Sequence, residues 1–305
     1  MRTYSPHFYL AFFLLLNIFN FIDRNLLIAF APQIKSDFNL TNVEWGLLTG
    51  VYFLFFYSVF GIFMGVLGDK FNRMKIAAAG VFLWSLMTAL TGVAKSFAHL
   101  IIARALIGVG ESALTPNSIS MLSDVYNQNR RGTASAIYYL GIPLGVGLAM
   151  LIAAYFGPMF GWRTVFISLG IIGVGLAIIT YFLTEPIRGQ LDNPSQSHEK
   201  SMSIREIINL TKSTLYNSKS LTLIIVGSIF LHIPLGAGNF EVLWAVNERG
   251  FTSSEYNSLF GIFFIIGGSI GAVMGGVLSD KLSYLFKGGV MSFLTISYLL
   301  LIPLT

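Results

Sequence analysis

Nine apolar stretches dominate this chain of 305 residues, and each is long enough to cross a membrane as one helix. Crossing roughly 30 Å of hydrocarbon takes about 20 predominantly apolar residues, with every backbone hydrogen bond made inside the segment. Charged residues make up only 11% of the chain, where a soluble domain has roughly 25%. The sequence therefore predicts an all-α, multi-pass membrane protein. The predicted spans are 8–34, 43–68, 74–94, 97–123, 132–156, 162–184, 220–246, 255–279 and 286–304.

The basic residues are distributed unequally between the two sides of the predicted membrane. With the N-terminus inside, thirteen of the nineteen Lys and Arg residues lie in cytoplasmic connections, and four lie opposite, at Lys35, Lys95, Arg163 and Arg249. The other two, Arg24 and Arg104, are inside spans. Because positive connections mark the cytoplasmic side, we expect a cell-membrane protein with a cytoplasmic N-terminus. The net charge of +5 comes largely from these connections, so we expect lipid headgroups as partners and no nucleic acid.

One long polar stretch separates the sixth predicted span from the seventh. It combines Pro, Gly, Ser and charged residues, a composition typical of a linker between domains. We expect an N-terminal bundle of six helices at residues 1–186, a cytoplasmic linker at 187–219 and a partial, three-helix bundle at 220–305.

An internal repeat relates residues 41–70 to residues 252–281, with a shift of 211 positions and no gaps. Eleven of the thirty aligned pairs are identical, where membrane composition alone would give about three or four. "GVLGDK" aligns with "GVLSDK" at the end of the repeat. Both copies run in the same direction across the predicted membrane, which indicates two halves related by an axis along the membrane normal.

Ionisable residues well inside the first and fourth predicted spans are candidates for function, because charge in a membrane is costly unless it serves one. Asp23 and Arg24 lie in the first span, where the repeat aligns them with Pro234 and Leu235. A pair needed only for the scaffold should recur in both halves, so this asymmetry favours function. Asn17, Asn20 and Arg24 form a polar stripe at helical spacing, which we expect to line a cavity near the midplane.

The fourth span adds Arg104 and Glu111, seven residues apart and therefore on one helical face. A buried glutamic acid is a candidate proton carrier, and the structural alternative is an interhelical ion pair or hydrogen bond. Gly108 and Gly110 between them are expected at a close packing surface.

A short loop, "GVLGDKFNRMK" at residues 65–75, follows the second predicted span. Gly65 and Gly68 should let helices approach closely. Asp69 is placed to pair with Arg73 or with a helix end, forming a lock that can break and re-form. The alternative is a solvated turn that carries topology charges. In the second copy Asp280 replaces Asp69, but Tyr284 stands at the Arg73 position, so that lock should be weaker.

This loop resembles the signature of the major facilitator superfamily, and "RALIGVGESALTP" resembles the family's second signature. "FIDR", "GVGE" and "EPIRG" resemble the spinster-like branch, whose members move lysophospholipids and sphingolipids. The resemblance implies twelve spans in two six-helix bundles, of which this chain would lack the last three. It also implies that Asp23 and Glu111 exchange protons, while Arg24 meets the cargo headgroup or a carboxylate.

We therefore expect a secondary transporter that works by alternating access, coupled to protons, as a monomer without cofactor or metal. Its cargo would be a lipid-like or anionic small molecule. The 305-residue chain is then either a fragment or lacks the contact that locks the bundles, and proton-coupled transport by this chain alone would count against that expectation.

Two alternatives remain open. One is an organic-anion or sugar-acid carrier, which shares parts of these motifs and predicts a polar cavity on both bundles. The other is a membrane protein that does not transport, either a receptor or an intramembrane enzyme. An enzyme is disfavoured because the sequence has no HExxH motif, no cysteine and no recognisable Ser/His/Asp set.

Overall fold

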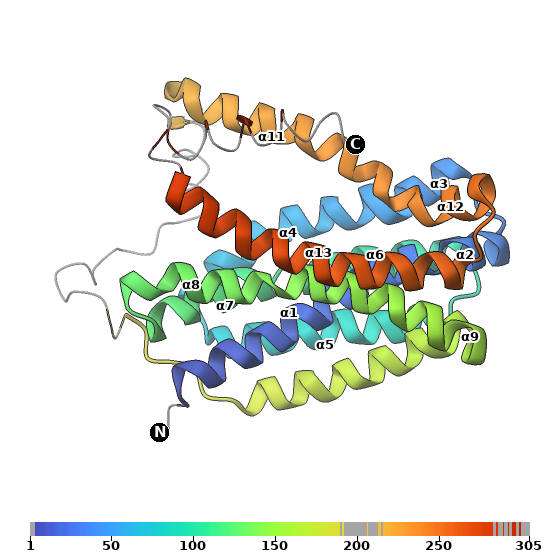
Figure 1. The fold of residues 1–305 in the computed structure, drawn as a ribbon. Coiled ribbons are helices and arrows are strands. Elements are labelled where there is room, and N and C mark those ends of the chain that lie inside the picture. Colours follow the sequence, from blue (N-terminus) through green and yellow to red (C-terminus); the bar gives the residue numbers. More distant parts are fainter. Residues whose placement is uncertain are drawn as a thin grey trace.

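The computed structural model describes residues 4–189 and 216–282, together with residues 191, 206, 213, 214, 285, 289, 292, 295, 296 and 299. Regular structure in these residues is entirely helical, which confirms the predicted all-α class (Figure 1). The elements are α1 (Pro6–Ala29), α2 (Ala31–Phe38), α3 (Asn42–Gly46), η1 (Leu47–Val51), α4 (Tyr52–Lys70), α5 (Arg73–Gly92), α6 (Phe97–Glu111), α7 (Leu114–Val125), α8 (Gln128–Tyr139), α9 (Gly141–Phe182), α11 (Lys219–Ala237), η3 (Gly238–Phe240), α12 (Glu241–Arg249) and α13 (Ser253–Leu282).

Six helical segments in the described part of the chain are long and apolar enough to cross a membrane. They coincide with the predicted spans one to six and eight, because the segment Gln128–Phe182 contains both the fifth and the sixth. The seventh predicted span corresponds to α11 and the helices that follow it. Most of the ninth, at 286–304, and most of the predicted linker lie outside the described residues.

A sharp reversal at Gly161 separates the two spans that α9 contains. Its backbone has φ 74° and ψ 157°, a combination that is essentially restricted to glycine. Three residues earlier, Pro158 lies inside the helix, where it cannot donate a backbone hydrogen bond. The chain therefore turns back on itself at this point, so that the two arms of α9 lie in opposite directions (Figure 1).

The two copies of the internal repeat begin with the same local structure. At the start of α3, Thr41 Oγ1 accepts a hydrogen bond from Glu44 N at 3.2 Å, and Glu44 Oε2 accepts one from Thr41 N at 2.8 Å. At the start of α13, Thr252 and Glu255 make the same two bonds at 3.2 and 3.0 Å. This reciprocal capping box satisfies two otherwise free backbone donors at each helix start. The repeat seen in the sequence is thus also present in hydrogen-bond geometry.

Close backbone contacts hold α6 against its neighbours. A Cβ atom on Gly110 would lie 2.8 Å from the carbonyl oxygen of Gly80 in α5, and one on Gly108 would lie 2.7 Å from the carbonyl oxygen of Phe53 in α4. These contacts confirm the predicted packing surface at Gly108 and Gly110. They also place the end of α6, with Glu111, between α4 and α5.

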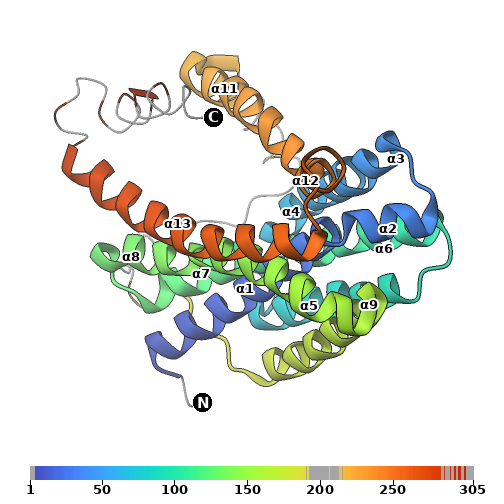
Figure 2. The ribbon, with the colours of Figure 1, turned by 45° about the vertical axis from the view of Figure 1, so that its right-hand side comes forward.

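The two halves of the chain meet at the end of the molecule where α2, α3 and α12 lie (Figure 2). There Trp45 Nε1 donates to the carbonyl oxygen of Asn239 at 2.9 Å, and Asn257 Nδ2 donates to that of Ala29 at 2.9 Å. Further along, α13 packs on α9, where a Cβ on Gly261 would lie 2.8 Å from the carbonyl oxygen of Gly147.

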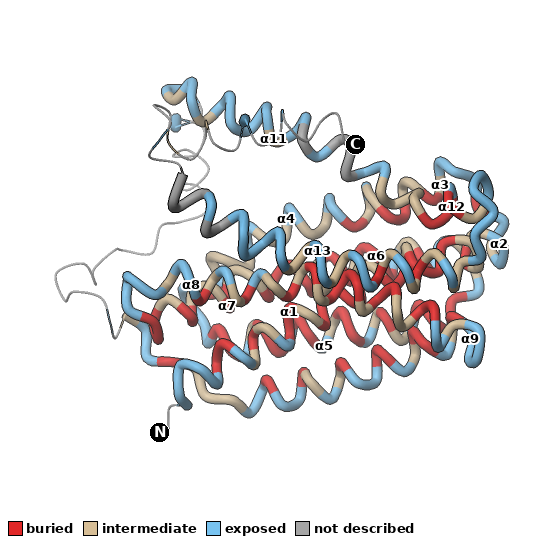
Figure 3. The backbone as a smooth tube through the Cα atoms, in the orientation of Figure 1, coloured by how far each residue is buried: buried red, intermediate tan, exposed pale blue. Residues whose placement is uncertain are grey.

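Burial is uneven between the halves. Most buried positions belong to the N-terminal helices, whereas α11 and the later part of α13 are mainly exposed where they are described (Figure 3). Helices α11 and α13 also diverge from each other away from the α12 end (Figure 2). The described contacts between the halves therefore gather toward one end of the molecule.

Candidate functional site

The four ionisable residues expected to matter lie close together, on α1 and α6. Arg24 and Glu111 form an ion pair in which Arg24 Nη2 and Nε donate to Glu111 Oε2 at 2.7 and 3.1 Å. The Glu111 side chain is fully buried, while 23% of the Arg24 side chain is exposed. Arg24 thus joins a buried carboxylate to a more open region.

Three aromatic rings surround the Arg24 guanidinium. Its Cζ lies 5.0 Å from the ring centre of Phe21, 4.7 Å from that of Phe53 and 4.9 Å from that of Tyr57. Cation–π attraction at these distances contributes about 0.5–2 kcal/mol, depending on exposure to water. The aromatic rings give the arginine favourable contacts besides Glu111.

Arg104 is buried and points toward the same place. Its Nη2 donates to the backbone carbonyl oxygen of Arg24 at 3.2 Å, and its Cζ lies 4.5 Å from the Phe53 ring centre. Phe53 is therefore in contact with both guanidinium groups. The shared helical face predicted for Arg104 and Glu111 brings them both to α1, where both meet Arg24.

Asp23 does not share a partner with Arg24, its neighbour in the sequence. Both of its carboxylate oxygens lie within hydrogen-bond distance of Thr88 Oγ1 on α5, at 2.6 and 2.7 Å, and the residue is only 1% exposed. Asp23 and Arg104 also line a small internal cavity of about 10 Å³. Successive residues on a helix point about 100° apart, so Asp23 and Arg24 face different neighbouring helices.

The predicted polar stripe on the first span is only partly correct. Asn17 and Asn20 are 0% and 4% exposed, and Asn17 Nδ2 donates to the carbonyl oxygen of Tyr138 at 2.8 Å. Gly141 packs directly against Asn17, since a Cβ there would lie 2.6 Å from Asn17 Nδ2. The stripe therefore mediates helix packing over most of its length, and only Arg24 retains exposure.

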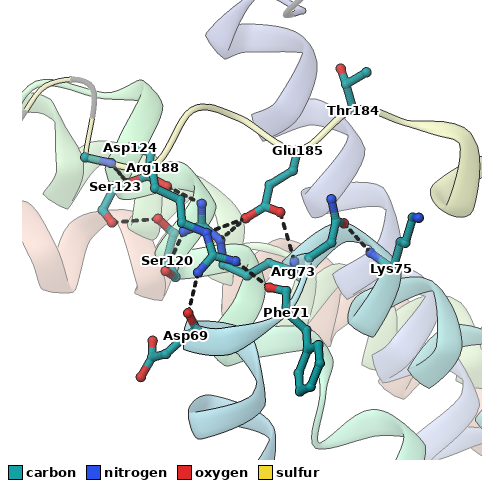
Figure 4. Close-up of polar contacts among 12 residues, drawn as sticks. Asp69, Phe71, Arg73, Lys75, Ser120, Ser123, Asp124, Thr184, Glu185 and Arg188 are labelled. Atoms are coloured by element: carbon teal, nitrogen blue, oxygen red, sulfur yellow. Dashed lines mark hydrogen bonds and ion pairs between the residues drawn. The ribbon is translucent and has the colours of Figure 1, made fainter. Parts of the chain in front are cut away.

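The predicted lock between Asp69 and Arg73 is wrong in its pairing. Arg73 is buried and forms ion pairs with Asp124 and Glu185, both at 2.6 Å. Asp69 is exposed and its carboxylate points away from Arg73 (Figure 4). Its backbone carbonyl oxygen accepts a hydrogen bond from Arg188 at 2.6 Å. Arg73 turns inward because one buried and one partly buried carboxylate from other segments stabilise it better than one solvated neighbour.

The cluster around Arg73 connects three segments that are distant in sequence. Glu185 also receives hydrogen bonds from Arg73 N at 3.2 Å and from Arg188 Nε at 3.0 Å, and Asp124 receives one from Gly189 N at 2.9 Å. Arg188 also donates to the carbonyl oxygen of Phe71 (Figure 4). Asp124 and Glu185 were not among the functional residues predicted from the sequence. The "EPIRG" motif, which contains Glu185 and Arg188, was the signal that could have found this cluster.

The two glycines of the loop differ. A Cβ on Gly68 would lie 2.5 Å from Asn117 Oδ1, as expected for close approach, but one on Gly65 would meet no described atom within 4 Å. The close packing predicted at Gly65 is therefore wrong for the described part of the chain. Asp280 lies in α13, and its side chain is outside the described residues.

A polytopic helical bundle with a parallel repeat and buried charges on its first and fourth spans defines a class of membrane protein built from two related bundles. The chain belongs to the Major Facilitator Superfamily, whose family model matches residues 13–305. It contains the six-helix N-terminal bundle of that fold and part of the C-terminal bundle.

Individual relatives agree with this assignment. The chain is 30% identical over 275 residues to the sphingosine-1-phosphate transporter SPNS2 of Danio rerio, covering 86% of this chain and 54% of that protein. It is 29% identical over 166 residues to a probable L-galactonate transporter of Escherichia coli, covering 54% of this chain and 36% of that protein.

A solved structure is similar over most of the chain. It is a bacterial homologue of the human lysosomal transporter Spinster in an inward-facing, unoccupied conformation, with 27% identity and a TM-score of 0.80. The match covers 94% of this chain and 65% of that one. The chain spans about half the length or less of these curated relatives.

Proposed function

We propose that this chain forms the substrate-binding and proton-binding part of a secondary transporter for amphipathic anions of the lysolipid class. The observation that supports this best is the Arg24–Glu111 pair, which is buried on the glutamate side and 23% exposed on the arginine side. If the pair served only stability, exposure of the arginine to solvent would bring no benefit, because water weakens the Coulomb attraction between the two charges.

Exchange of partners at Arg24 is the proposed coupling step. Glu111 Oε1 accepts no hydrogen bond from the described residues, so a proton can bind there without breaking one. Protonation removes the charge that holds Arg24, and the guanidinium then binds the phosphate or carboxylate of the cargo. Cargo binding and proton binding thus favour each other, and together they shift the equilibrium between outward-facing and inward-facing states.

Asp23 is proposed as a second proton site with another role. Its carboxylate faces Thr88 on α5, so its protonation alters the contact between α1 and α5. Arg104, which lines the same small cavity, is the nearby positive charge in this proposal. Asn20, which is buried one helical turn before Arg24 on α1, is proposed as a supporting residue.

An apolar tail on the cargo follows from the asymmetry between the halves. The positions that align with Asp23 and Arg24 are Pro234 and Leu235, and α13 has no charged residue between Tyr256 and Ser279. One half therefore offers charge to a headgroup, and the other offers apolar surface to a chain. Relatives named as sphingosine-1-phosphate transporters are consistent with such a cargo.

Binding of sphingosine 1-phosphate to the purified chain in detergent tests the proposal directly. Sphingosine, which lacks the phosphate, is the matched ligand, and Arg249→Ala is the matched variant because Arg249 stacks on Trp244 far from the pair in sequence. We expect Arg24→Ala to weaken sphingosine 1-phosphate binding at least about tenfold and to leave sphingosine binding unchanged, since one charge-assisted bond contributes about 1.5–3 kcal/mol. Equal loss for both ligands would contradict a headgroup role for Arg24.

Substrate-dependent proton flux in liposomes separates a carrier from a receptor that does not transport. Labelling of a cysteine introduced at position 4 in sealed, oriented vesicles tests the proposed cytoplasmic N-terminus. Mass measurement of the intact particle tests the proposed monomer.

A sugar-acid or other organic-anion carrier is the second candidate. The similarity to a probable L-galactonate transporter supports it, and Arg24 could bind a sugar carboxylate as well as a phosphate. Mass spectrometry of compounds that copurify with the protein distinguishes the two. A bound lysolipid favours the first candidate, and a bound organic acid favours the second.

A further inference from the structure

A lipid-sized groove lies away from the charged pair, where α5 ends and α6 begins. Its volume is about 390 Å³, and its walls are mostly apolar. Leu90, Val93 and Ile102, at 45%, 53% and 57% exposure, line it together with Met87. The groove opens at the connection between two membrane-spanning helices, so its apolar part lies at membrane depth and its mouth lies near the interface.

Two polar side chains stand at the mouth of this groove, Lys95 and His99. The backbone N–H of Lys95 donates to His99 Nδ1 at 3.2 Å. Because Nδ1 accepts this bond, the neutral imidazole carries its proton on Nε2, which remains a donor. The groove therefore has a cation and an N–H donor at one end and apolar side chains along its length.

Lys95 differs from the other basic residues predicted on its side of the membrane. Lys35 donates to Asn42, Arg163 lies 3.6 Å from Asp37, and Arg249 stacks on Trp244. Lys95 is exposed, and its ammonium group forms no hydrogen bond or ion pair with another described residue. Its charge is thus available to a ligand.

The acidic residue near this connection does not offset that charge. Asp37 Oδ2 accepts a hydrogen bond from Trp162 Nε1 at 2.9 Å and faces Arg163, which in turn donates to the carbonyl oxygen of Ala94 at 2.7 Å. The start of α6 adds the partial positive charge of a helix N-terminus beside Lys95. Charge at the mouth of the groove is therefore positive.

We infer that this groove binds an anionic phospholipid of the leaflet that faces the α5–α6 connection. The phosphate contacts Lys95 and His99 Nε2, and one acyl chain lies along Leu90, Val93 and Ile102. An apolar chain explains the groove's lining, and a phosphate explains its unpaired cation. This site is separate from the proposed transport site and would hold a structural or regulatory lipid.

Lipid retention by the purified chain tests the inference. The protein is reconstituted in nanodiscs of phosphatidylcholine containing a minor fraction of phosphatidylglycerol, and lipids that stay bound after detergent extraction are counted by native mass spectrometry. Lys95→Ala removes the cation, and Ile102→Trp fills the groove. Lys35→Ala removes a paired cation predicted on the same side and is the control.

We expect enrichment of phosphatidylglycerol over phosphatidylcholine in the unchanged protein. Lys95→Ala should reduce that enrichment about fivefold, the effect of one basic residue near an anionic headgroup. Ile102→Trp should reduce retention of the lipid, and Lys35→Ala should change neither. Circular dichroism and elution volume establish that each variant is folded.

Three results would overturn the inference. Equal retention of both lipids would exclude headgroup recognition. Unchanged enrichment in a folded Lys95→Ala protein would exclude that residue as the anchor. Displacement of the lipid by soluble glycerol phosphate at equal concentration would identify a site for a free phosphate, which needs no apolar groove.

Discussion

Arg24 and Glu111, 87 residues apart in the chain, are joined by a 2.7 Å ion pair between the first and fourth membrane-spanning segments. The pair places a cation at the edge of the buried region and a carboxylate inside it. Protonation of Glu111 and binding of a ligand to Arg24 would therefore both act on this ion pair.

Replacing Glu111 with Gln should reduce the pH dependence of sphingosine 1-phosphate binding to the part that comes from Asp23 and from the phosphate itself, while leaving the protein folded. The amide keeps an oxygen that can accept from Arg24 but cannot take up a proton in this range. Binding is measured over a pH series in detergent, with Glu248→Gln, an exposed glutamate, as the control. A pH profile in Glu111→Gln that is unchanged from that of the original protein would remove this residue from the coupling step.

Replacing Arg73 with Met should lower the stability of the protein by about 3–5 kcal/mol, because buried Asp124 loses its ion-pair partner and partly buried Glu185 keeps only Arg188. Thermal unfolding measures the loss, and adding Asp124→Asn and Glu185→Gln to the variant should recover part of it. Asp69→Asn is the matched control and should change stability by less than about 0.5 kcal/mol, since its carboxylate is exposed. A larger loss of stability from Asp69→Asn than from Arg73→Met would contradict this account and favour a structural role for the Asp69 carboxylate, as the sequence suggested.

The two capping boxes should contribute equally. Thr41→Ala and Thr252→Ala each remove a side-chain acceptor at the start of a helix and should cost about 1 kcal/mol. Hydrogen exchange at the first turns of α3 and α13 reports the local opening, and the corresponding Thr→Ser variants should retain protection. Loss at one site alone would show that the two copies are not equivalent in energy.

Gly161→Ala should destabilise the protein by about 1–3 kcal/mol, although a Cβ there would meet no described atom within 4 Å. The cost is conformational, because an L-residue with a side chain disfavours a φ of 74°. Gly175→Ala is the control in the same element, with equally open space but helical backbone, and should be neutral or slightly stabilising. Similar apparent Tm values for the two variants would contradict this account.

Much of the fold could be read from local sequence. Each span can be recognised from its own apolar residues, and the described helices lie where those stretches predicted them. The repeat was visible as identities such as Thr41 with Thr252, because a capping box depends on residues three apart. The close contacts at Gly108 and Gly110 were expected for the same reason, since small residues in a span mark packing.

It was harder to predict from the sequence which charged residues pair with each other. Asp23, Arg24, Glu111 and Arg73 were all predicted to matter, but Asp69 was expected to pair with Arg73, four residues away, or with a helix end. The structure instead uses Asp124 and Glu185, 51 and 112 positions further on. Thr88, the partner of Asp23, gave no signal because a threonine inside an apolar span is ordinary.

The amino-acid sequence by itself determined that this chain crosses the membrane many times, that its halves are related and that charges lie inside two of its spans. These properties depend on transfer of each segment from water to lipid and on contacts a few residues apart. Tertiary structure alone decided which carboxylate meets which guanidinium and which face of α1 is sealed. Coulomb attraction and close packing depend on distance in space, and helices far apart in sequence become neighbours only when the bundle assembles.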